Sequence, residues 1–336
     1  IVAIALFLPL YTQTAASQAG FGQQGWGMHW LDGWRGAIWI HAVAAVPWVV
    51  IIVAVGLRHI EPQLEEAALL DGTQAQVLFG VTLRRCWFAM GAAAIWIGVV
   101  TAGEFTVTDM WPGLRTYAED IFRGFAVGET PEMAAFGLLP SLVATVALLT
   151  AVLVVLHHAL RGDYQPPKRP PRTFKLGPLG WLHFAVVVAL LACLVGVPLL
   201  NLTIQLGRQV HQLPGGELQR TWGLTHAGEM LLYSVWEFRR EMIWSLGTSV
   251  VAATLAIVVA TPLAWLARGG SWRSWPLILA AAILFALPGP LLGLLLVRLF
   301  NAPNWTWLSF LYDRSIAAPT LALALRAFPL VAIVTW

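Results

Sequence analysis

The stretch AIWIHAVAAVPWVVIIVAVGL, residues 37–57, contains no Asp, Glu, Lys or Arg. A helix of about 20 predominantly apolar residues is long enough to cross the ~30 Å hydrocarbon core of a bilayer. Leu, Ala, Val and Gly dominate this long run, whereas strands of a membrane barrel are shorter and alternate between polar and apolar residues. The stretch therefore predicts a transmembrane helix.

Similar apolar runs follow along the rest of the chain. Hydrophobic residues make up 58% of the sequence and charged residues 11%, against roughly 25% charged in an ordinary soluble domain. Besides residues 37–57, the expected spans are Cys86–Gly103, Ala134–Leu156, Leu176–Leu200, Ile243–Ala267, Trp275–Val297 and Ser315–Trp336, with a shorter apolar piece at Ile1–Leu10. The predicted fold class is all-α, a polytopic transmembrane helical bundle.

A polar segment, EPQLEEAALLDGTQAQVLFGVTL at residues 61–83, separates the first two of these spans. Pro62 suits the first position of a helix, and Glu65 and Glu66 favour its positive end. Gly72 is expected to end this helix in the left-handed conformation. Ten residues give a helix of only ~15 Å, too short to span a bilayer.

A second short helix is expected directly after the first. Thr73 and Gln76 have the spacing of a capping box. The residues that are expected to share one face of this second helix are Ala75, Leu78, Phe79 and Thr82. The segment is therefore predicted to be two short helices that meet at a glycine elbow, which suits docking to another protein. An ordinary amphipathic connector is the alternative.

Several motifs resemble the fused, two-repeat permeases of binding-protein-dependent ABC importers of the ferric-iron and thiamine type. They are the Glu-Ala-Ala sequence at residues 66–68 with Gly72 four residues later, VVTAGEF at 99–105, PLAWLAR at 262–268 and ALPGP at 286–290. The family motif commonly runs to a Leu-Pro pair, whereas Arg84 follows Leu83 here.

The resemblance implies a type I importer permease (MetI-like) in the bacterial inner membrane. It implies ABC ATPase subunits in the cytoplasm, a periplasmic solute-binding protein and a lipid bilayer as partners, with no nucleic acid. The residues implied to dock the ATPase are Glu65, Glu66, Ala67, Ala68, Asp71 and Gly72. Ferric iron is the first expected substrate, with thiamine, sulfate, polyamine and phosphonate as alternatives.

A weak internal repeat organises the expected domains. A shift of 282 positions places Pro47 on Pro329 and aligns further identical residues around them. We expect residues 1–160 to be the C-terminal part of a first permease repeat, with the docking loop at 61–83. Residues 176–336 would be the N-terminal part of a second repeat, cut before its own docking loop near position 348.

The segment that joins the two repeats, residues 161–175, is basic and rich in proline. Positive charge is enriched in cytoplasmic loops, so this linker is expected to be cytoplasmic. Counting spans backward from it places the docking loop in the cytoplasm and residues 104–133 outside. Counting forward places residues 201–242 outside.

Ionisable groups inside or beside the spans are the candidates for a substrate pathway. His41 and Arg326 lie within predicted spans, and Glu104 lies at an outer helix end. Buried ionisable residues in a membrane commonly face a cavity or a partner. The alternatives are that His41 is a packing residue, that Arg326 pairs with backbone, and that Glu104 solvates a helix end. Close helix packing is expected from the small residues Gly91, Ala92, Ala93, Ala94 and Gly98.

The chemistry of the sequence favours a transport subunit over an enzyme. A Gly-Lys pair is absent, so the chain lacks a phosphate-binding loop and ATP is expected to be bound by a partner. Neither a nucleophile elbow nor a metal-binding pattern is present, and no catalytic residue, metal or cofactor is expected. A secondary, ion-coupled transporter remains the alternative, although the Asp and Glu residues fall in loops or at span ends rather than at membrane depth. A membrane-embedded enzyme is the third reading.

Overall fold

The computed structural model describes most of the chain. The described residues are 8–21, 31, 33–58, 60–104, 106–111, 114–117, 119–120, 123–124, 139–140, 142–151, 177, 180–212, 216, 218–268, 271–287 and 289–335. The predicted linker at 161–175 and the apolar piece at 1–7 lie outside these residues. The chain forms two units, one built from residues 1–101, 105–115 and 163–231, the other from 102–104, 116–162 and 232–336.

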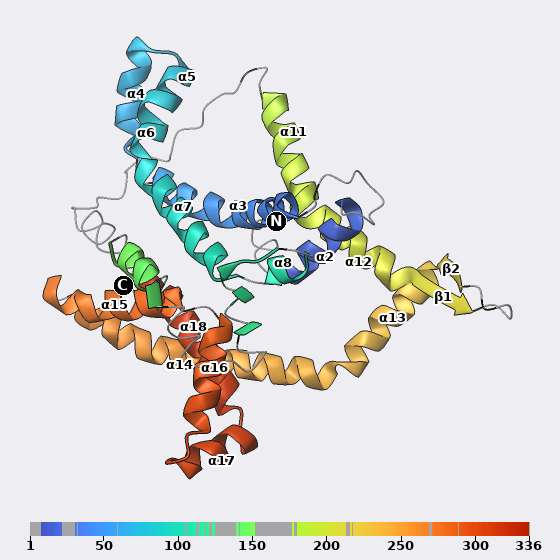
Figure 1. Ribbon diagram of the computed structural model, residues 1–336. Helices are drawn as coiled ribbons and strands as arrows, with labels where there is room; N and C mark the ends of the chain where they lie inside the picture. The colour runs from blue at the N-terminus through green and yellow to red at the C-terminus, as the bar shows by residue number, and fades with distance from the viewer. Residues whose placement is uncertain are drawn as a thin grey trace. The chain divides into compact units, whose positions relative to one another are not determined.

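Unit 1 contains the predicted docking loop (Figure 1). Its α-helices are α2 (Leu10–Phe21), α3 (Trp34–Arg58), α4 (Pro62–Asp71), α5 (Gln74–Val77), α6 (Leu83–Arg85), α7 (Trp87–Ala102), α8 (Thr106–Asp109), α11 (Gly180–Leu191) and α12 (Val197–Gly207). Two π-helical turns, η1 (Leu78–Thr82) and η3 (Ala192–Gly196), interrupt them. Helix α13 (Leu224–Glu237) crosses from unit 1 into unit 2.

The core of unit 1 forms where α3 meets other elements at residues with small side chains. Ala37 and Ile40 pack with Val107 and Trp111 in one buried cluster. A Cβ added at Gly36 would come within 2.5 Å of the Trp111 ring, so the indole occupies space that only glycine leaves open. Gln18 of α2 donates a hydrogen bond to the Met110 carbonyl at 2.6 Å.

Unit 2 is built from five helices in the described residues of its C-terminal part. They are α14 (Arg239–Ala267), α15 (Ser271–Ala286), α16 (Gly289–Phe300), α17 (Thr306–Arg314) and α18 (Ala317–Thr335). Helix α14 buries alanine at regular four-residue intervals, at Ala252, Ala256, Ala260 and Ala264. Small side chains at this spacing allow close approach between helix backbones.

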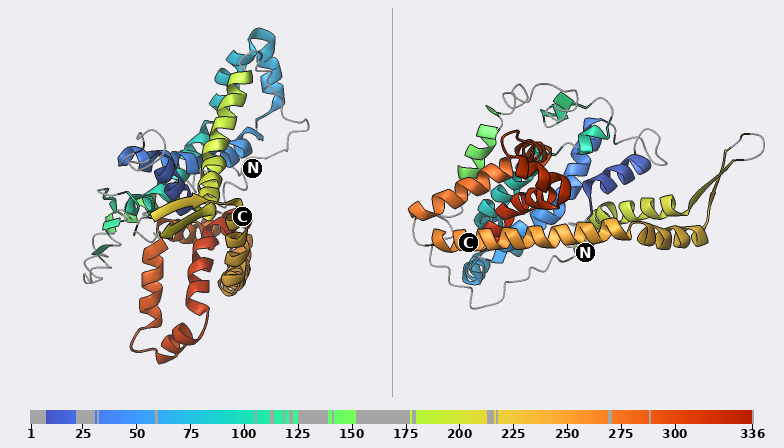
Figure 2. Two further views of the ribbon diagram at one scale, coloured as in Figure 1. Left: turned by 90° about the vertical axis from the view of Figure 1, so that its right-hand side faces the viewer. Right: turned by 90° about the horizontal axis from the view of Figure 1, so that it is seen from below.

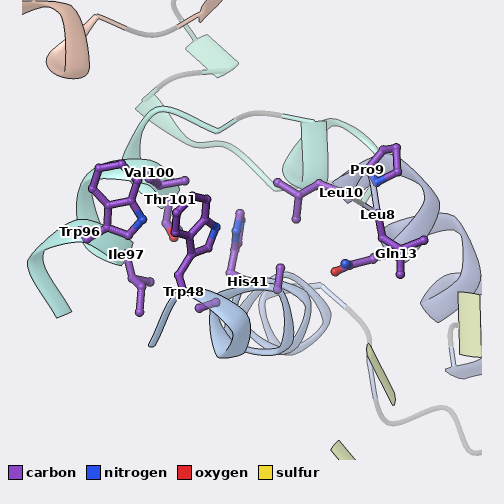
Figure 3. Close-up of a pocket in the computed structure, with 12 residues that line it drawn as sticks. Leu8, Pro9, Leu10, Gln13, His41, Trp48, Trp96, Ile97, Val100 and Thr101 are labelled. Carbon is purple, nitrogen blue, oxygen red and sulfur yellow. The ribbon is translucent and has the colours of Figure 1, made fainter. Parts of the chain in front are cut away.

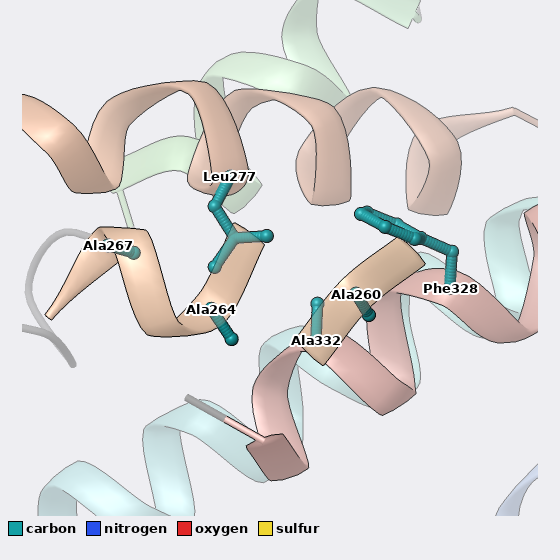
Figure 4. Packing of buried hydrophobic residues seen from close by; sticks show 6 residues of the cluster. All are labelled: Ala260, Ala264, Ala267, Leu277, Phe328 and Ala332. Atoms are coloured by element: carbon teal, nitrogen blue, oxygen red, sulfur yellow. The ribbon is translucent and has the colours of Figure 1, made fainter. Parts of the chain in front are cut away.

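Alanines of α14 contact α18 and α15 in one buried cluster. Ala260, Ala264 and Ala267 pack against Leu277 of α15 and against Phe328 of α18 (Figure 4). A second cluster joins α16, α17 and α18 through Leu292, Leu296, Phe300, Leu308 and Ala318. The left view of Figure 2 shows α16 and α18 side by side, with α17 closing one end.

The membrane prediction is supported by three continuous helical segments, one of which includes the π-helical turn η3, that are long and apolar enough to cross a bilayer. These helical segments are Trp34–Arg58, Gly180–Gly207 and Arg239–Ala267. Three more predicted spans correspond to bent pairs of helices, which would bring the number within the described residues to 6 if each pair is one span. Within the remaining predicted span, Ala134–Leu156, the described residues are 139–140 and 142–151, and they contain a shorter apolar helix, Leu142–Ala151.

The span expected at Trp275–Val297 is formed by two helices with a sharp bend between them. The chain bends by 103° between Trp272–Ala286 and Leu291–Phe300. The sequence Pro288-Gly289-Pro290 lies at the break. Proline disfavours helical conformation in the residue before it, so Pro288 favours the end of α15 at Ala286, whereas Pro290 stands in the first turn of α16, where proline is tolerated. The chain also bends by 90° between Thr306–Arg314 and Ala317–Ala332, so the helix expected at Ser315–Trp336 begins just after a bend.

The segment 201–242, predicted only as a long outer segment, contains a β-hairpin. Strands β1 (Arg208–Gln212) and β2 (Leu218–Trp222) pair antiparallel, with Arg208 opposite Trp222. Trp222 covers Gly207, where any added Cβ would overlap the indole, and its Nε1 donates to the Thr203 carbonyl at 3.4 Å. The sequence Pro214-Gly215-Gly216 between two short polar stretches was the available turn signal.

Candidate docking elbow and cavity

The segment 60–86, which we call the docking elbow, folds as two short helices between α3 and α7. Helix α4 covers Pro62–Asp71 and has proline in its first turn, as predicted. Helix α5 covers Gln74–Val77. Figure 1 shows α4 and α5 side by side at one end of α7, with α8 at the other end. The prediction of two short helices joined at Gly72 is confirmed.

The conformation expected at Gly72 was wrong. Gly72 has φ −142° and ψ 165°, which is extended backbone rather than the left-handed conformation. Thr73 is also extended, with φ −74° and ψ 159°. A residue that caps the start of a helix takes this conformation because its side chain must reach back to a free backbone N–H. The chain therefore ends α4 by extending into the cap of α5.

The predicted capping box between Thr73 and Gln76 is present. The Gln76 backbone N–H donates to Thr73 Oγ1 at 3.4 Å, and the Thr73 backbone N–H donates to Gln76 Oε1 at 2.9 Å. The two bonds satisfy backbone donors that have no partner within the helix. They fix the angle at which α5 begins.

The predicted apolar face after the capping box differs in the structure, because a π-helical turn follows α5. Ala75 is exposed and Phe79 is 68% exposed, whereas Val77 and Thr82 are buried. The Leu83 N–H donates to the Leu78 carbonyl, the five-residue spacing of a π-helix. That spacing places Val77 and Thr82, five residues apart, on the same inner side.

A buried hydrogen bond joins the two halves of the elbow. Thr82 Oγ1 donates to Glu65 Oε1 at 2.7 Å. The two side chains are only 4% and 5% exposed, respectively. Hydrogen bonds to a carboxylate are stronger than those between neutral groups, and a buried carboxylate without a donor is costly. Glu65 therefore holds α4 against η1 and does not face outward.

The other predicted docking residues differ in exposure. Glu66, Ala67 and Asp71 are exposed, whereas Ala68 and Gly72 are half-buried. Leu70, at the end of α4, is 87% exposed. Acidic side chains thus surround a leucine that is accessible to a partner.

The elbow is attached to the spans by close contact between α3 and α7. A Cβ added at Gly56 would overlap the Ala89 methyl and lie 3.2 Å from Cys86 Sγ. Gly91 and Gly98 have no heavy atom within 4 Å of an added Cβ. The expectation that these two glycines provide close packing was therefore wrong. Within the described residues, the tight contact of α7 with α3 lies near the start of α7, where Ala89 meets Gly56.

The three predicted pathway residues are divided between the two units. His41 belongs to unit 1, whereas Glu104 and Arg326 belong to unit 2. Glu104 is half-buried and follows α7 in the chain. Arg326 is exposed, and its guanidinium lies where a side chain at Gly289 would stand.

His41 lines a cavity of about 280 Å³ within unit 1 (Figure 3). The other lining residues are Leu8, Pro9, Leu10, Gln13, Ala44, Ala45, Trp48, Trp96, Ile97, Val100 and Thr101. The Trp48 and Trp96 rings are 5.3 Å apart at 51°. Sequence analysis missed Gln13 and both tryptophans, because their meeting depends on how α2, α3 and α7 pack rather than on local spacing.

No group of three or more His, Cys, Asp or Glu side chains that could hold a metal ion occurs among the described residues. Comparisons with protein-family models, with curated proteins and with solved structures found no match.

Proposed function

We propose that this chain is the transmembrane permease subunit of an ATP-driven ABC importer. In this proposal it forms the solute pathway, cytoplasmic ATPase subunits dock on the elbow and hydrolyse ATP, and a periplasmic solute-binding protein delivers the solute. Ferric iron remains the substrate that the sequence resemblance proposes.

The observation that carries the proposal is the exposed end of α4. Leu70 is 87% exposed in a segment too polar to lie within the bilayer core. Glu66, Ala67 and Asp71 around it are also exposed. Single exposed leucines are common on protein surfaces. The support therefore comes from the place of Leu70 in the segment that resembles the docking loop of permeases.

The second support is that the elbow is rigidly built. The capping box and the buried Thr82–Glu65 hydrogen bond fix α4 relative to α5 and η1. A rigid knob attached directly to spans can transmit a movement of its partner to them. Arg58 precedes the elbow, and Arg84 and Arg85 lie at its end, which fits a cytoplasmic position.

The test is co-purification of ATP-hydrolysing activity with the full-length, affinity-tagged chain from its native membranes. Leu70→Glu should lower the recovered ATPase activity about 30-fold, the effect of losing a ~2 kcal/mol hot spot. The matched control is Leu218→Glu on β2, where the leucine is also exposed but the predicted topology places it outside.

Each result is normalised to the amount of chain in the membrane. If the wild-type chain recovers no ATPase activity, or if Leu70→Glu recovers as much as wild type, the proposal is wrong. An equal loss in Leu218→Glu would also contradict it, since that would show a general effect of an added charge.

A further inference from the structure

The cavity beside His41 contains a buried polar group without a hydrogen-bond partner. Gln13 is 5% exposed, and among the described residues its Oε1 has no hydrogen-bond partner. Figure 3 shows its amide pointing toward His41 across the cavity. A buried amide oxygen without a donor is costly, so such groups in native proteins commonly meet water or a ligand.

The cavity is larger than a packing defect. Its volume of about 280 Å³ is close to the lower end of ligand pockets, which is about 300 Å³, whereas a water molecule takes about 30 Å³. The walls combine indole rings and aliphatic side chains with a few polar groups, namely Gln13, His41 and Thr101. This composition is typical of small-molecule sites.

Charge and shape of the lining define the class of ligand. Among the described residues that line the cavity there is no Asp, Glu, Lys, Arg, Tyr or Cys, and His41 is the only titratable one. A bound ion would lose its hydration without gaining an opposite charge. Indole rings instead favour contact with planar rings, and a glutamine amide can both donate to and accept from a nitrogen heterocycle.

The position of the cavity fits a pathway. His41 is seven residues from the start of α3, and Trp96 is six residues from the end of α7. Both therefore lie about 10 Å along their helices from those ends. The elbow joins the opposite ends of the same two helices.

We propose that this cavity binds a small, uncharged, planar nitrogen heterocycle as a solute subsite. The part of the inference that places the subsite in an import pathway rests on the proposed function. The Gln13 amide would pair with the edge of the ring, and Trp48 or Trp96 would contact its face. The proposal departs from ferric iron, sulfate and phosphonate, whose charges the lining does not balance.

The test uses adenine as the probe and a cysteine as the reporter. Thr101→Cys is introduced into the full chain after Cys86→Ala and Cys193→Ala, and its labelling by a maleimide is timed in lipid nanodiscs. Adenine at about 5 mM should slow labelling about sixfold, as expected for a dissociation constant of about 1 mM. Sulfate at the same concentration should have no effect.

Variants separate a specific site from general crowding. Gln13→Leu should abolish protection by adenine, whereas Gln205→Leu, an exposed glutamine on α12, should retain it. Ala44→Leu, which fills part of the cavity, should also abolish protection. It tests the same site independently, in case Gln13→Leu does not fold. Protection that survives both Gln13→Leu and Ala44→Leu, or no protection in the parent chain, would overturn the subsite.

The same preparations are assayed for co-purifying ATPase activity, which distinguishes the two proposals. ATPase recovery without adenine protection removes the subsite and leaves the importer. Adenine protection without ATPase recovery removes the importer and leaves a heterocycle site, as in a secondary transporter.

Discussion

Thr82→Val tests whether the buried hydrogen bond fixes the docking elbow. Valine keeps the shape of threonine but removes the hydroxyl that donates to Glu65 Oε1 at 2.7 Å. A hydrogen bond to a charged group contributes about 1.5–3 kcal/mol, and the remaining carboxylate would be buried without its donor. This free energy corresponds to a roughly 10- to 150-fold increase in the opening of α4.

Hydrogen exchange of the α4 backbone amides measures this opening directly. Thr203→Val is the matched control, because its hydroxyl donates only to a carbonyl of its own helix, at 2.8 Å from Leu199 O, and is exposed. Thr203→Val should change the exchange rate of the α4 amides less than about threefold.

A double variant completes the test. Glu65→Leu combined with Thr82→Val removes both partners and should recover most of the lost protection, since replacing both groups with apolar ones can be nearly neutral. The hydrogen bond does not hold the elbow if the α4 amides of Thr82→Val exchange at the wild-type rate. The same conclusion follows if the double variant loses more protection than Thr82→Val and Glu65→Leu lose together.

Two further predictions concern glycines and the cap. Gly56→Val should lower the amount of chain in the membrane several-fold, because its side chain would overlap Ala89. Gly98→Val should be tolerated, since no heavy atom lies within 4 Å of a Cβ added there. Quantitative immunoblotting of membranes measures both variants. Thr73→Ala should destabilise the start of α5 by about 1 kcal/mol. Gly72→Ala should change stability by less than about 0.5 kcal/mol, because the backbone at Gly72 is extended. Hydrogen exchange of the α5 amides compares the two variants, and equal effects would contradict the capping role of Thr73.

Sequence reasoning succeeded where a local rule sets the structure. The capping box at Thr73 and Gln76 depends on groups three residues apart, and the first turn of α4 on Pro62. It failed at Gly72, because glycine permits left-handed backbone without requiring it. The π-helical turn after Val77 also escaped it, since a one-residue change in helical spacing leaves no distinctive composition.

Features that depend on packing between helices were harder to predict. Gly91 and Gly98 were expected to be close contacts, but an added side chain at either would meet open space in the described structure. The alanine repeat of α14 was a better signal for close packing, because four positions at four-residue spacing put a continuous small face on one side. A single small residue does not indicate which side of a helix packs against a neighbour.

The elbow and the cavity share two helices, which bears on how docking could reach the solute site. Helix α3 carries His41 and Trp48 and leads into the elbow, whereas α7 leaves the elbow and carries Trp96. The two helices meet tightly at Gly56 and again at the Trp48–Trp96 ring pair. Since the first contact leaves no space for a methyl group, compression there cannot absorb a rotation of the elbow, and in the proposed importer that rotation would pass along α3 and α7. The ring pair beside the cavity is therefore where such a rotation would first change the space available to a solute.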